Sequence, residues 1–353
     1  MKVRVRDIAV KAKVSPATVS NALNKKQGVS SKVAERIMRI ASEMGYEPPK
    51  DKSEPDHKYI RLVVYKSHGL VVMDTQFFAE LIESIQRECK SEGLELMITH
   101  LNAKDADLAA RAQEIRNEDC MGILLLGTEM SPEELARFTP CKSTLVALDN
   151  LFRHEHVNAV VMNNYDAGYQ ATNALYQAGH RDIGHITSTV SFSNVRYRRK
   201  GFQAALEEKG IHVTPDSIWY VTPTLEGAYQ DMLKLLDSGR KLPTAFFAGN
   251  DIMAVGSMRA MHERGVRIPD DVSIIGMDDM ALCLVSNPPL STVRVLRQEM
   301  GIAAVQSLLF VAAQMKTGVL KTELSVDLVE RSSVRTITEA ESAATQKRRK
   351  NNA

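Results

Sequence analysis

Residues 5–23 read VRDIAVKAKVSPATVSNAL, and this stretch decides the architecture of the N-terminal part of the chain. Apolar residues recur at helical spacing from Val5 to about Lys13, which predicts a first short helix. Ser15 and Pro16 then form a strong helix start, because serine can cap an orphan amide and proline lacks the amide that would stay unpaired. A second helix is expected to end near Leu23. The residues predicted to face inward are Ile8, Ala9, Ala12, Val19 and Leu23.

The N-terminal segment is basic, although the whole chain of 353 residues has a net charge of only +2. Residues 1–40 hold ten Lys or Arg and two acidic residues, a net charge of +8, whereas residues 41–340 total −9. A third helix is expected to begin after Ser30, as its cap, and to stop at Gly45. A basic head on an acidic body is typical of a nucleic-acid-binding module fused to another domain. Two short helices joined by a tight turn suit the major groove of DNA.

The pattern of residues 5–23 resembles, position for position, the helix-turn-helix signature of the lac repressor family of bacterial transcription regulators. The resemblance implies that one set of side chains reads bases and another holds phosphates of double-stranded DNA. Among the readers only Asn21 can hydrogen-bond strongly to a base edge, most naturally to adenine. The alternative is a small helical domain whose basic residues are simply solvated. The implied base readers are Pro16, Ala17 and Asn21, and the implied phosphate contacts are Thr18 and Ser20.

Residues 47–58 read EPPKDKSEPDHK and predict an extended linker, since they contain three prolines and no large apolar residue. Members of the family that the head resembles usually carry a leucine-bearing hinge helix at this place. In a dimer such leucines enter the minor groove and bend the DNA. This linker has no leucine, and Pro55 would disrupt a helix. The sequence therefore predicts no wedge of that kind and little DNA bending.

The remainder alternates apolar, β-branched runs with longer helical patterns, which predicts parallel sheets covered by helices on both faces. Eight such units exceed one sheet, so we expect an α/β domain of two lobes with a cleft between them. The expected organisation is a DNA-binding domain at 1–46, the linker at 47–58, the two-lobed domain at 59–338 and a basic, disordered tail at 339–353. The predicted strands are Ile60–Tyr65, Leu94–Thr99, Gly122–Leu126, Ser143–Leu148, Val157–Met162, Ile183–Thr187, Ala245–Ala248 and Val272–Ile275; the predicted helices are Phe77–Glu92, Tyr165–Ala178, Val195–Lys209, Asp251–Arg264 and Gln298–Met315.

Several motifs in this second part resemble the effector domain of the same family, which is itself similar to periplasmic sugar-binding proteins. The resemblance covers residues 60–337 and implies a two-lobed, periplasmic-binding-protein-like fold, a homodimer and a small-molecule effector. The tail has no leucine heptad, so no tetramer by that device is expected. The motifs are Asp74–Glu80, Leu148–Asn150, Ala178–Ile186, Arg196–Phe202, Ala248–Gly256, Ile275–Asp279 and Pro288–Val293.

Some residues of these motifs follow strands, and open α/β sheets bind ligands at the carboxyl ends of their strands. A guanidinium can fork onto two hydroxyls, carboxylates and an amide can accept and donate hydrogen bonds, and an aromatic ring can stack on a sugar ring or a planar base. This chemistry predicts a carbohydrate effector, a sugar or a sugar phosphate. The candidate effector-binding residues are Phe77, Asp149, Arg198, Asn250 and Asp278.

Other polar and aromatic residues are interpreted as structural. Asp251 is expected to cap the helix that follows it, and Asp279, His180 and His185 are expected to be structural, with no metal bound. Trp219 is assigned to the core, and Phe78 to either the core or the pocket. Salt bridging between the lobes is the alternative role of Arg198, Asn250 and Asp278. Two residues, Phe192 and Val295, are predicted to make the pocket less polar than a typical sugar site.

The motifs that the sequence lacks narrow the class of protein further. The sequence contains no P-loop, GxSxG, HExxH or strand-associated GxGxxG, so neither an enzyme nor a bound cofactor is expected. Its four cysteines lie far apart, and it lacks an apolar run of 18 residues, which predicts a soluble, cytoplasmic protein without a membrane span. The resulting hypothesis is a dimeric, ligand-responsive transcription repressor. The alternative is a DNA-binding regulator controlled by a protein partner.

Overall fold

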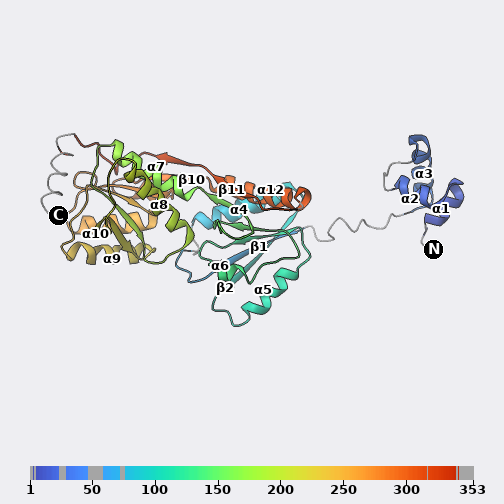
Figure 1. Cartoon of the computed structure of the whole chain (residues 1–353), viewed down its shortest axis with the longest axis horizontal. Helices are drawn as coiled ribbons and strands as arrows, with labels where there is room; N and C mark the ends of the chain where they lie inside the picture. Colours follow the sequence, from blue (N-terminus) through green and yellow to red (C-terminus); the bar gives the residue numbers. More distant parts are fainter. Residues whose placement is uncertain are drawn as a thin grey trace. The chain divides into compact units, whose positions relative to one another are not determined.

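The computed structural model describes residue 3 and residues 5–23, 29–46, 59–71, 76–315, 317–338 and 341. The chain divides into two compact units, Met1–Asp56 and His57–Ala353, and each is described by itself (Figure 1). The predictions about the linker, the missing hinge leucine, the basic run Lys347–Lys350 and the tail fall outside the described residues. The domain boundaries expected from the sequence stay predictions.

The N-terminal unit, called the head, consists of three short helices around one small core: α1 (Val5–Ala12), α2 (Pro16–Leu23) and α3 (Ser31–Glu43). The expected start of α2 is confirmed, because the Ser15 hydroxyl oxygen accepts a hydrogen bond from the amide of Thr18 at 3.1 Å. The expected cap of α3 is wrong in one respect, since Ser30 precedes the helix but its side chain makes no capping bond.

The head core shows why these helices pack. Ile8, Val19 and Ile37, one from each helix, are fully buried in the same hydrophobic cluster. The prediction for the inner face of α2 needs one correction: Ala22 is buried, while Leu23 at the helix end is only half-buried. The small side chain of Ala22 lets α2 pack closely against the head core. Pro16 and Ala17 lie on the other face of α2 and are exposed.

The second unit consists of two lobes, each with a six-stranded sheet that has helices on both faces (Figure 1). In the first lobe the strand order is β11-β5-β4-β3-β1-β2, and α4 and α12 pack against each other on one face. This lobe contains β1 (Tyr59–Lys66), α4 (Gln76–Ser91), β2 (Glu95–Asn102), α5 (Leu108–Asn117), β3 (Gly122–Leu126), α6 (Pro132–Leu135), β4 (Leu145–Leu148), β5 (Asn158–Met162), α12 (Arg297–Gln314) and β11 (Lys321–Leu324).

In the second lobe the strand order is β12-β10-β9-β8-β6-β7, with α7 packed on α8 and α9 packed on α10. The expectation of parallel sheets is confirmed except at the edge, where β12 runs antiparallel to β10. This lobe contains α7 (Asn164–Gln177), β6 (Ile183–Ser188), α8 (Ser193–Glu207), a short 3-10 turn (Pro215–Ser217), β7 (Ile218–Val221), α9 (Leu225–Asp237), β8 (Ala245–Ala248), α10 (Asp251–Glu263), β9 (Ser273–Asp278), α11 (Leu282–Val285), β10 (Ser291–Val295) and β12 (Val326–Val329).

The chain passes between the lobes three times, at residues 162–164, 295–297 and 324–326. Central strands such as β3 and β4 are buried along their whole length, as expected for parallel strands with helices on both faces. The first two crossings leave the ends of β5 and β10, so the carboxyl ends of both sheets face the region between the lobes. No helix in the described part of the chain is long and apolar enough to span a membrane.

Helices α7 and α8 approach backbone to backbone through two glycines. A Cβ atom on Gly201 of α8 would lie 1.9 Å from the carbonyl oxygen of Tyr165. A Cβ atom on Gly168 of α7 would lie 2.0 Å from the carbonyl oxygen of Arg198. Both separations are far below van der Waals contact, so these positions require the absence of a side chain. The contact also fixes the part of α8 that carries Arg198.

Candidate DNA-binding surface and ligand pocket

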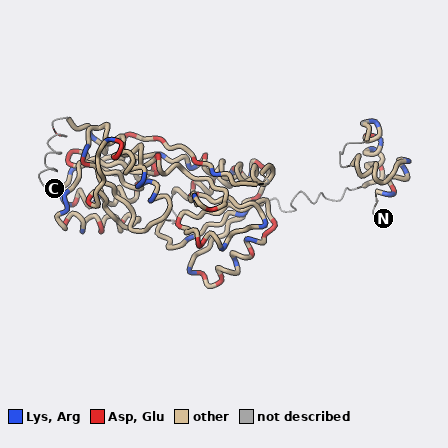
Figure 2. Tube along the Cα trace, viewed as in Figure 1, with Lys and Arg blue, Asp and Glu red and all other residues tan. Residues whose placement is uncertain are grey.

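The outward face of α2 carries the residues that the sequence assigned to base reading. Pro16 and Ala17 are exposed, and Asn21 lies one turn after Ala17 on the same side of the helix, half-buried. The Asn21 side chain forms no hydrogen bond with any residue in the described ranges, so its amide group can reach a base edge. Thr18 and Ser20 are half-buried, and the Thr18 hydroxyl lies 2.8 Å from that of Ser15. The head also displays Lys and Arg on α1 and α3 (Figure 2).

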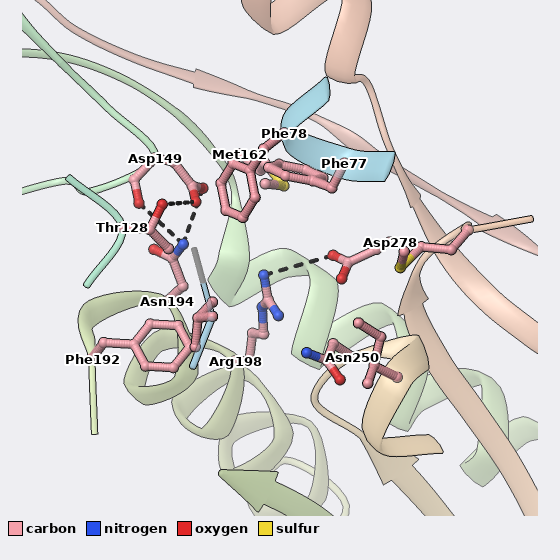
Figure 3. A pocket seen from close by; sticks show the side chains of 13 residues that line it. Phe77, Phe78, Thr128, Asp149, Met162, Phe192, Asn194, Arg198, Asn250 and Asp278 are labelled. Atoms are coloured by element: carbon pink, nitrogen blue, oxygen red, sulfur yellow. Dashed lines mark hydrogen bonds and ion pairs between the residues drawn. The ribbon is translucent and has the colours of Figure 1, made fainter. Parts of the chain in front are cut away.

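A pocket lies between the two lobes, with about 470 Å³ of empty space that includes its opening to solvent. Phe77, Asp149, Arg198, Asn250 and Asp278 all line it, although they come from five different segments of the chain (Figure 3). Phe78, which the sequence assigned to either the core or the pocket, and Phe192, which was predicted to make the pocket less polar, line it as well. Residues that the sequence analysis did not identify complete the lining: Val71, Thr128, Met162, Asn194, Ile252 and Met280.

Asp149 is buried in the first lobe, directly after β4, in a left-handed backbone conformation with φ of 56°. Its carboxylate accepts hydrogen bonds from the Thr128 hydroxyl at 2.7 Å and from the Asn194 amide at 3.0 Å (Figure 3). Asn194 belongs to α8 of the second lobe, so its bond to Asp149 joins the lobes across the pocket. Burial is the main cause that raises the pKa of Asp149 to about 6.

Arg198 is 6% exposed and uses two of its three nitrogens to hold the second lobe together. Nε donates to Oδ1 of Asn164 at 2.8 Å, and Nη1 donates to the carbonyl oxygen of Gly249 at 2.5 Å. Nη2 lies 3.9 Å from a carboxylate oxygen of Asp278. Both residues belong to the second lobe, so the expected alternative of a salt bridge between lobes does not describe this pair. The geometry leaves Nη2 and Asp278 directed toward the pocket (Figure 3).

The expected cap of α10 is wrong by one residue. Asn250 caps the helix, because its side-chain oxygen accepts a hydrogen bond from the amide of Met253 at 2.8 Å. Asp251 is fully buried instead, and accepts hydrogen bonds from the Thr292 hydroxyl at 2.6 Å and from the amide of Met280 at 2.9 Å. Burial, and then the neighbouring charge of Asp278, raise the pKa of Asp251. Asn250 thus combines capping with a place in the pocket lining.

Asp278 ends β9 with φ of 113°, and burial raises its pKa while the positive charge of Arg198 lowers it. A left-handed backbone is costly for a residue other than glycine and is concentrated at functional sites. Asp149 and Asp278 both adopt it, one at the edge of each lobe. The two strand ends are therefore shaped to direct carboxylates into the pocket.

The structural assignments for the remaining residues are confirmed by their contacts. Asp279 forms ion pairs with Arg294 and Arg331. Trp219 is fully buried in the second lobe. The contacts of the histidines are internal: His180 bonds to the Thr244 hydroxyl and the Arg335 carbonyl, and His185 stacks between Phe202 and Phe247. The prediction for Val295 is wrong, since this residue packs in the core and not in the pocket lining.

Replacing Asp149 by asparagine is expected to stabilise the protein at neutral pH. The folded pKa of about 6 lies above the value of an unfolded aspartate, so the ionised carboxylate costs stability above pH 6, and this cost vanishes below about pH 4. Asparagine keeps partners for Thr128 and Asn194 without a charge. We expect Asp149→Asn to raise the free energy of unfolding by about 2 kcal/mol at pH 7.5. Urea unfolding at pH 7.5 and pH 4 checks this, and an equal difference at both pH values would contradict it.

A head with an outward recognition helix and a body with a polar pocket between two lobes together define a DNA-binding regulator with a ligand-binding domain. Residues 4–49 match the family described as bacterial regulatory proteins, lacI family, and residues 172–334 match the periplasmic binding protein-like domain. The ribose operon repressor of Haemophilus influenzae is 33% identical over 310 residues, which cover 86% of this chain and 90% of the relative. The chain belongs to the lacI family of bacterial regulatory proteins, and it is a DNA-binding transcription regulator.

Two further similarities agree with this assignment. The HTH-type transcriptional repressor PurR of Pasteurella multocida is 30% identical over 311 residues, covering 87% of this chain and 90% of the relative. The solved complex of the transcriptional regulator CelR with cellobiose superposes with a TM-score of 0.70 at 22% identity, covering 94% of this chain and all of that one. At this identity the similarity to CelR shows a common fold.

Proposed function

We propose that this regulator is a repressor whose affinity for operator DNA changes when a carbohydrate binds between its lobes. The observation that carries the proposal is the pairing of Arg198 with Asp278 in the pocket, opposite the aromatic rings of Phe77 and Phe78. Operator DNA lies in the cytoplasm, where the proposal places the protein. The proposed activity is binding and release, without a chemical step.

The pocket suits a polyhydroxylated ring better than a wholly apolar ligand. Nη2 of Arg198, the carboxylate of Asp278 and the amide nitrogen of Asn250 are available to hydroxyl groups, because the other polar atoms of Arg198 and Asn250 hold the protein. Phe77 and Phe78 lie edge to face, with ring centroids 4.9 Å apart, and offer a face for a sugar ring. Two similar proteins are named for a sugar, the ribose operon repressor and the CelR–cellobiose complex.

A ligand in this pocket would contact both lobes and so bias their relative arrangement. Asp149 belongs to the first lobe, while Arg198 and Asp278 belong to the second, and the bond from Asn194 to Asp149 already joins them. A ligand that binds one arrangement better shifts the population toward it. In a homodimer, which we propose for this chain as in the lac repressor dimer bound to operator, such a shift alters how two heads fit successive major grooves.

The test is calorimetric titration of the full chain with pentoses, hexoses, disaccharides, sugar phosphates and purine bases. Saturable heat with one sugar, lost in Asp278→Asn, supports the proposal. If only a purine base bound, control by a small ligand would still stand, but the proposal that the ligand is a carbohydrate would be refuted. Silence across the whole panel would refute the small-molecule switch and favour control by a protein partner.

Replacing Asn21 by alanine is expected to cost about 1–3 kcal/mol of binding to the specific operator, because alanine removes the one strong base-reading group of α2. The loss should be confined to the base pair that Asn21 reads, so that binding to unrelated DNA stays the same. An operator selected from random DNA, and its single-base variants, provide the measurement by fluorescence anisotropy. Val10→Ala, at an exposed position of α1, serves as the control. An unchanged preference at every base pair would reject the base-reading role.

A further inference from the structure

Glu129 lies three residues after the end of β3, and its side chain is completely buried in the first lobe. Its carboxylate is surrounded by backbone amides of the loop that follows β1. Oε1 accepts a hydrogen bond from the amide of Val71 at 2.8 Å, and the His68 ring nitrogen Nδ1 lies 3.3 Å from it. Oε2 accepts three hydrogen bonds, from the amides of Ser67 at 3.0 Å, His68 at 3.0 Å and Gly69 at 2.9 Å.

Successive backbone amides that converge on one point form a nest for an anion. Gly69 makes this curl possible, since its φ of +72° is a conformation that other residues adopt at a cost. Here the anion is supplied by the protein's own glutamate, and a carboxylate forms stronger hydrogen bonds to amides than a neutral acceptor does. Four amides of the loop would lose their partner if the carboxylate were removed.

The loop that Glu129 holds reaches the ligand pocket through one residue, Val71. Val71 ends the described part of this loop, and α4, which carries Phe77 and Phe78 of the pocket lining, begins five residues further along the sequence. Thr128, the residue before Glu129, lines the pocket and donates to Asp149. The segment after β3 therefore reaches the pocket lining at two places, directly through Thr128 and indirectly through the hydrogen bond of Glu129 to the Val71 amide.

We propose that Glu129 is a positioning residue for ligand binding: its buried carboxylate fixes the Ser67–Val71 loop, holds Val71 in the pocket lining and so sets ligand affinity through the loop. The claim that Glu129 sets ligand affinity rests on the proposed binding of a carbohydrate. The claim that Glu129 fixes the loop does not, because the hydrogen bonds of the four amides can be followed without any ligand.

The experiment compares three full-length variants with the parent protein. Glu129→Gln keeps the shape of the side chain and removes the charge, whereas Glu129→Ala leaves a cavity that acetate can enter. Glu114→Gln, at an exposed position of α5, is the matched control. Hydrogen–deuterium exchange of the peptide containing Ser67–Val71 reports the loop, circular dichroism reports the fold, and calorimetric titration with ribose reports the pocket.

In Glu129→Gln and Glu129→Ala we expect the loop amides to exchange on the order of tenfold to a hundredfold faster, because each variant loses hydrogen bonds to a charged group. Sodium acetate, but not sodium chloride at the same ionic strength, should restore slow exchange in Glu129→Ala. Ribose affinity should fall about tenfold in Glu129→Gln and stay unchanged in Glu114→Gln.

Two results would overturn the inference: loop exchange that stays slow in both Glu129 variants, or loop exchange that is fast while ribose affinity equals that of the parent. Exchange that accelerates throughout the first lobe, without rescue by acetate, would also overturn it, since Glu129 would then support the whole fold. Absence of ribose binding in the parent protein counts against ribose as the effector, whereas exchange and acetate rescue still decide whether Glu129 positions the loop.

Discussion

Replacing Gly201 by alanine is expected to destabilise the second lobe by about 3 kcal/mol, the largest effect we expect from adding one methyl group. The new Cβ would lie 1.9 Å from the carbonyl oxygen of Tyr165 and 2.7 Å from the amide nitrogen of Tyr169, both in the backbone of α7. Backbone cannot rotate aside as a flexible side chain does, so α7 and α8 must separate. Alanine is also the better helix former by about 1 kcal/mol, so any net loss comes from the helix contact.

Urea unfolding, monitored by circular dichroism, measures this loss. Gln203→Ala, on a less buried side of the same helix, is the control and should change the free energy of unfolding by less than about 1 kcal/mol. Gly168→Ala should behave like Gly201→Ala, since its Cβ would meet the carbonyl oxygen of Arg198. A Gly201→Ala protein as stable as the parent would contradict the backbone contact between α7 and α8.

Replacing Arg198 by lysine is expected to lower carbohydrate affinity about a hundredfold, although the positive charge is kept. The guanidinium bonds to Asn164 and Gly249 with two nitrogens and leaves the third near Asp278. An ammonium group is a single point charge without this fork, so it cannot hold both partners and also face the pocket. The expected hundredfold change in affinity corresponds to losing charge-assisted hydrogen bonds between the guanidinium and the carbohydrate worth about 3 kcal/mol.

Calorimetric titration with the sugar that binds the parent protein measures the change. Arg199→Lys is the matched control, because Arg199 is the next residue of α8 and donates to the Tyr220 hydroxyl outside the pocket. Its affinity for the sugar should equal that of the parent. If Arg198→Lys bound the sugar as tightly as the parent, Arg198 would have a structural role only.

The framework of the protein could be predicted from the sequence because it depends on local patterns. Unbroken apolar runs such as Gly122–Leu126 became central strands, and the Ser15-Pro16 pair became the start of α2. The antiparallel pairing of β12 with β10 could not be predicted, since it depends on a third passage of the chain between the lobes. The close contact of α7 with α8 at Gly168 could not be predicted either, because a glycine within a helical pattern does not indicate which element packs against it.

The pocket was predictable where a residue type and a strand end coincided, as at Asp149 and Asp278. Thr128 and Asn194 were missed, because their role depends on bonds to Asp149 from separate elements. Asp251 was misassigned because its neighbour Asn250 can cap the helix equally well, and only the burial of Asp251 beside Thr292 distinguishes the two. Tertiary contacts of this kind leave no periodic signal in a sequence.

The central claim is that a ligand between the lobes controls the binding of operator DNA by the head. Its most direct test is the affinity of the full chain for its selected operator, measured by fluorescence anisotropy with and without the sugar that binds. We predict at least about a tenfold change in operator affinity for the parent protein, equivalent to about 1.4 kcal/mol of coupling, and no change for Arg198→Lys at the same sugar concentration. A parent protein that binds the sugar and holds its operator with unchanged affinity would contradict the account.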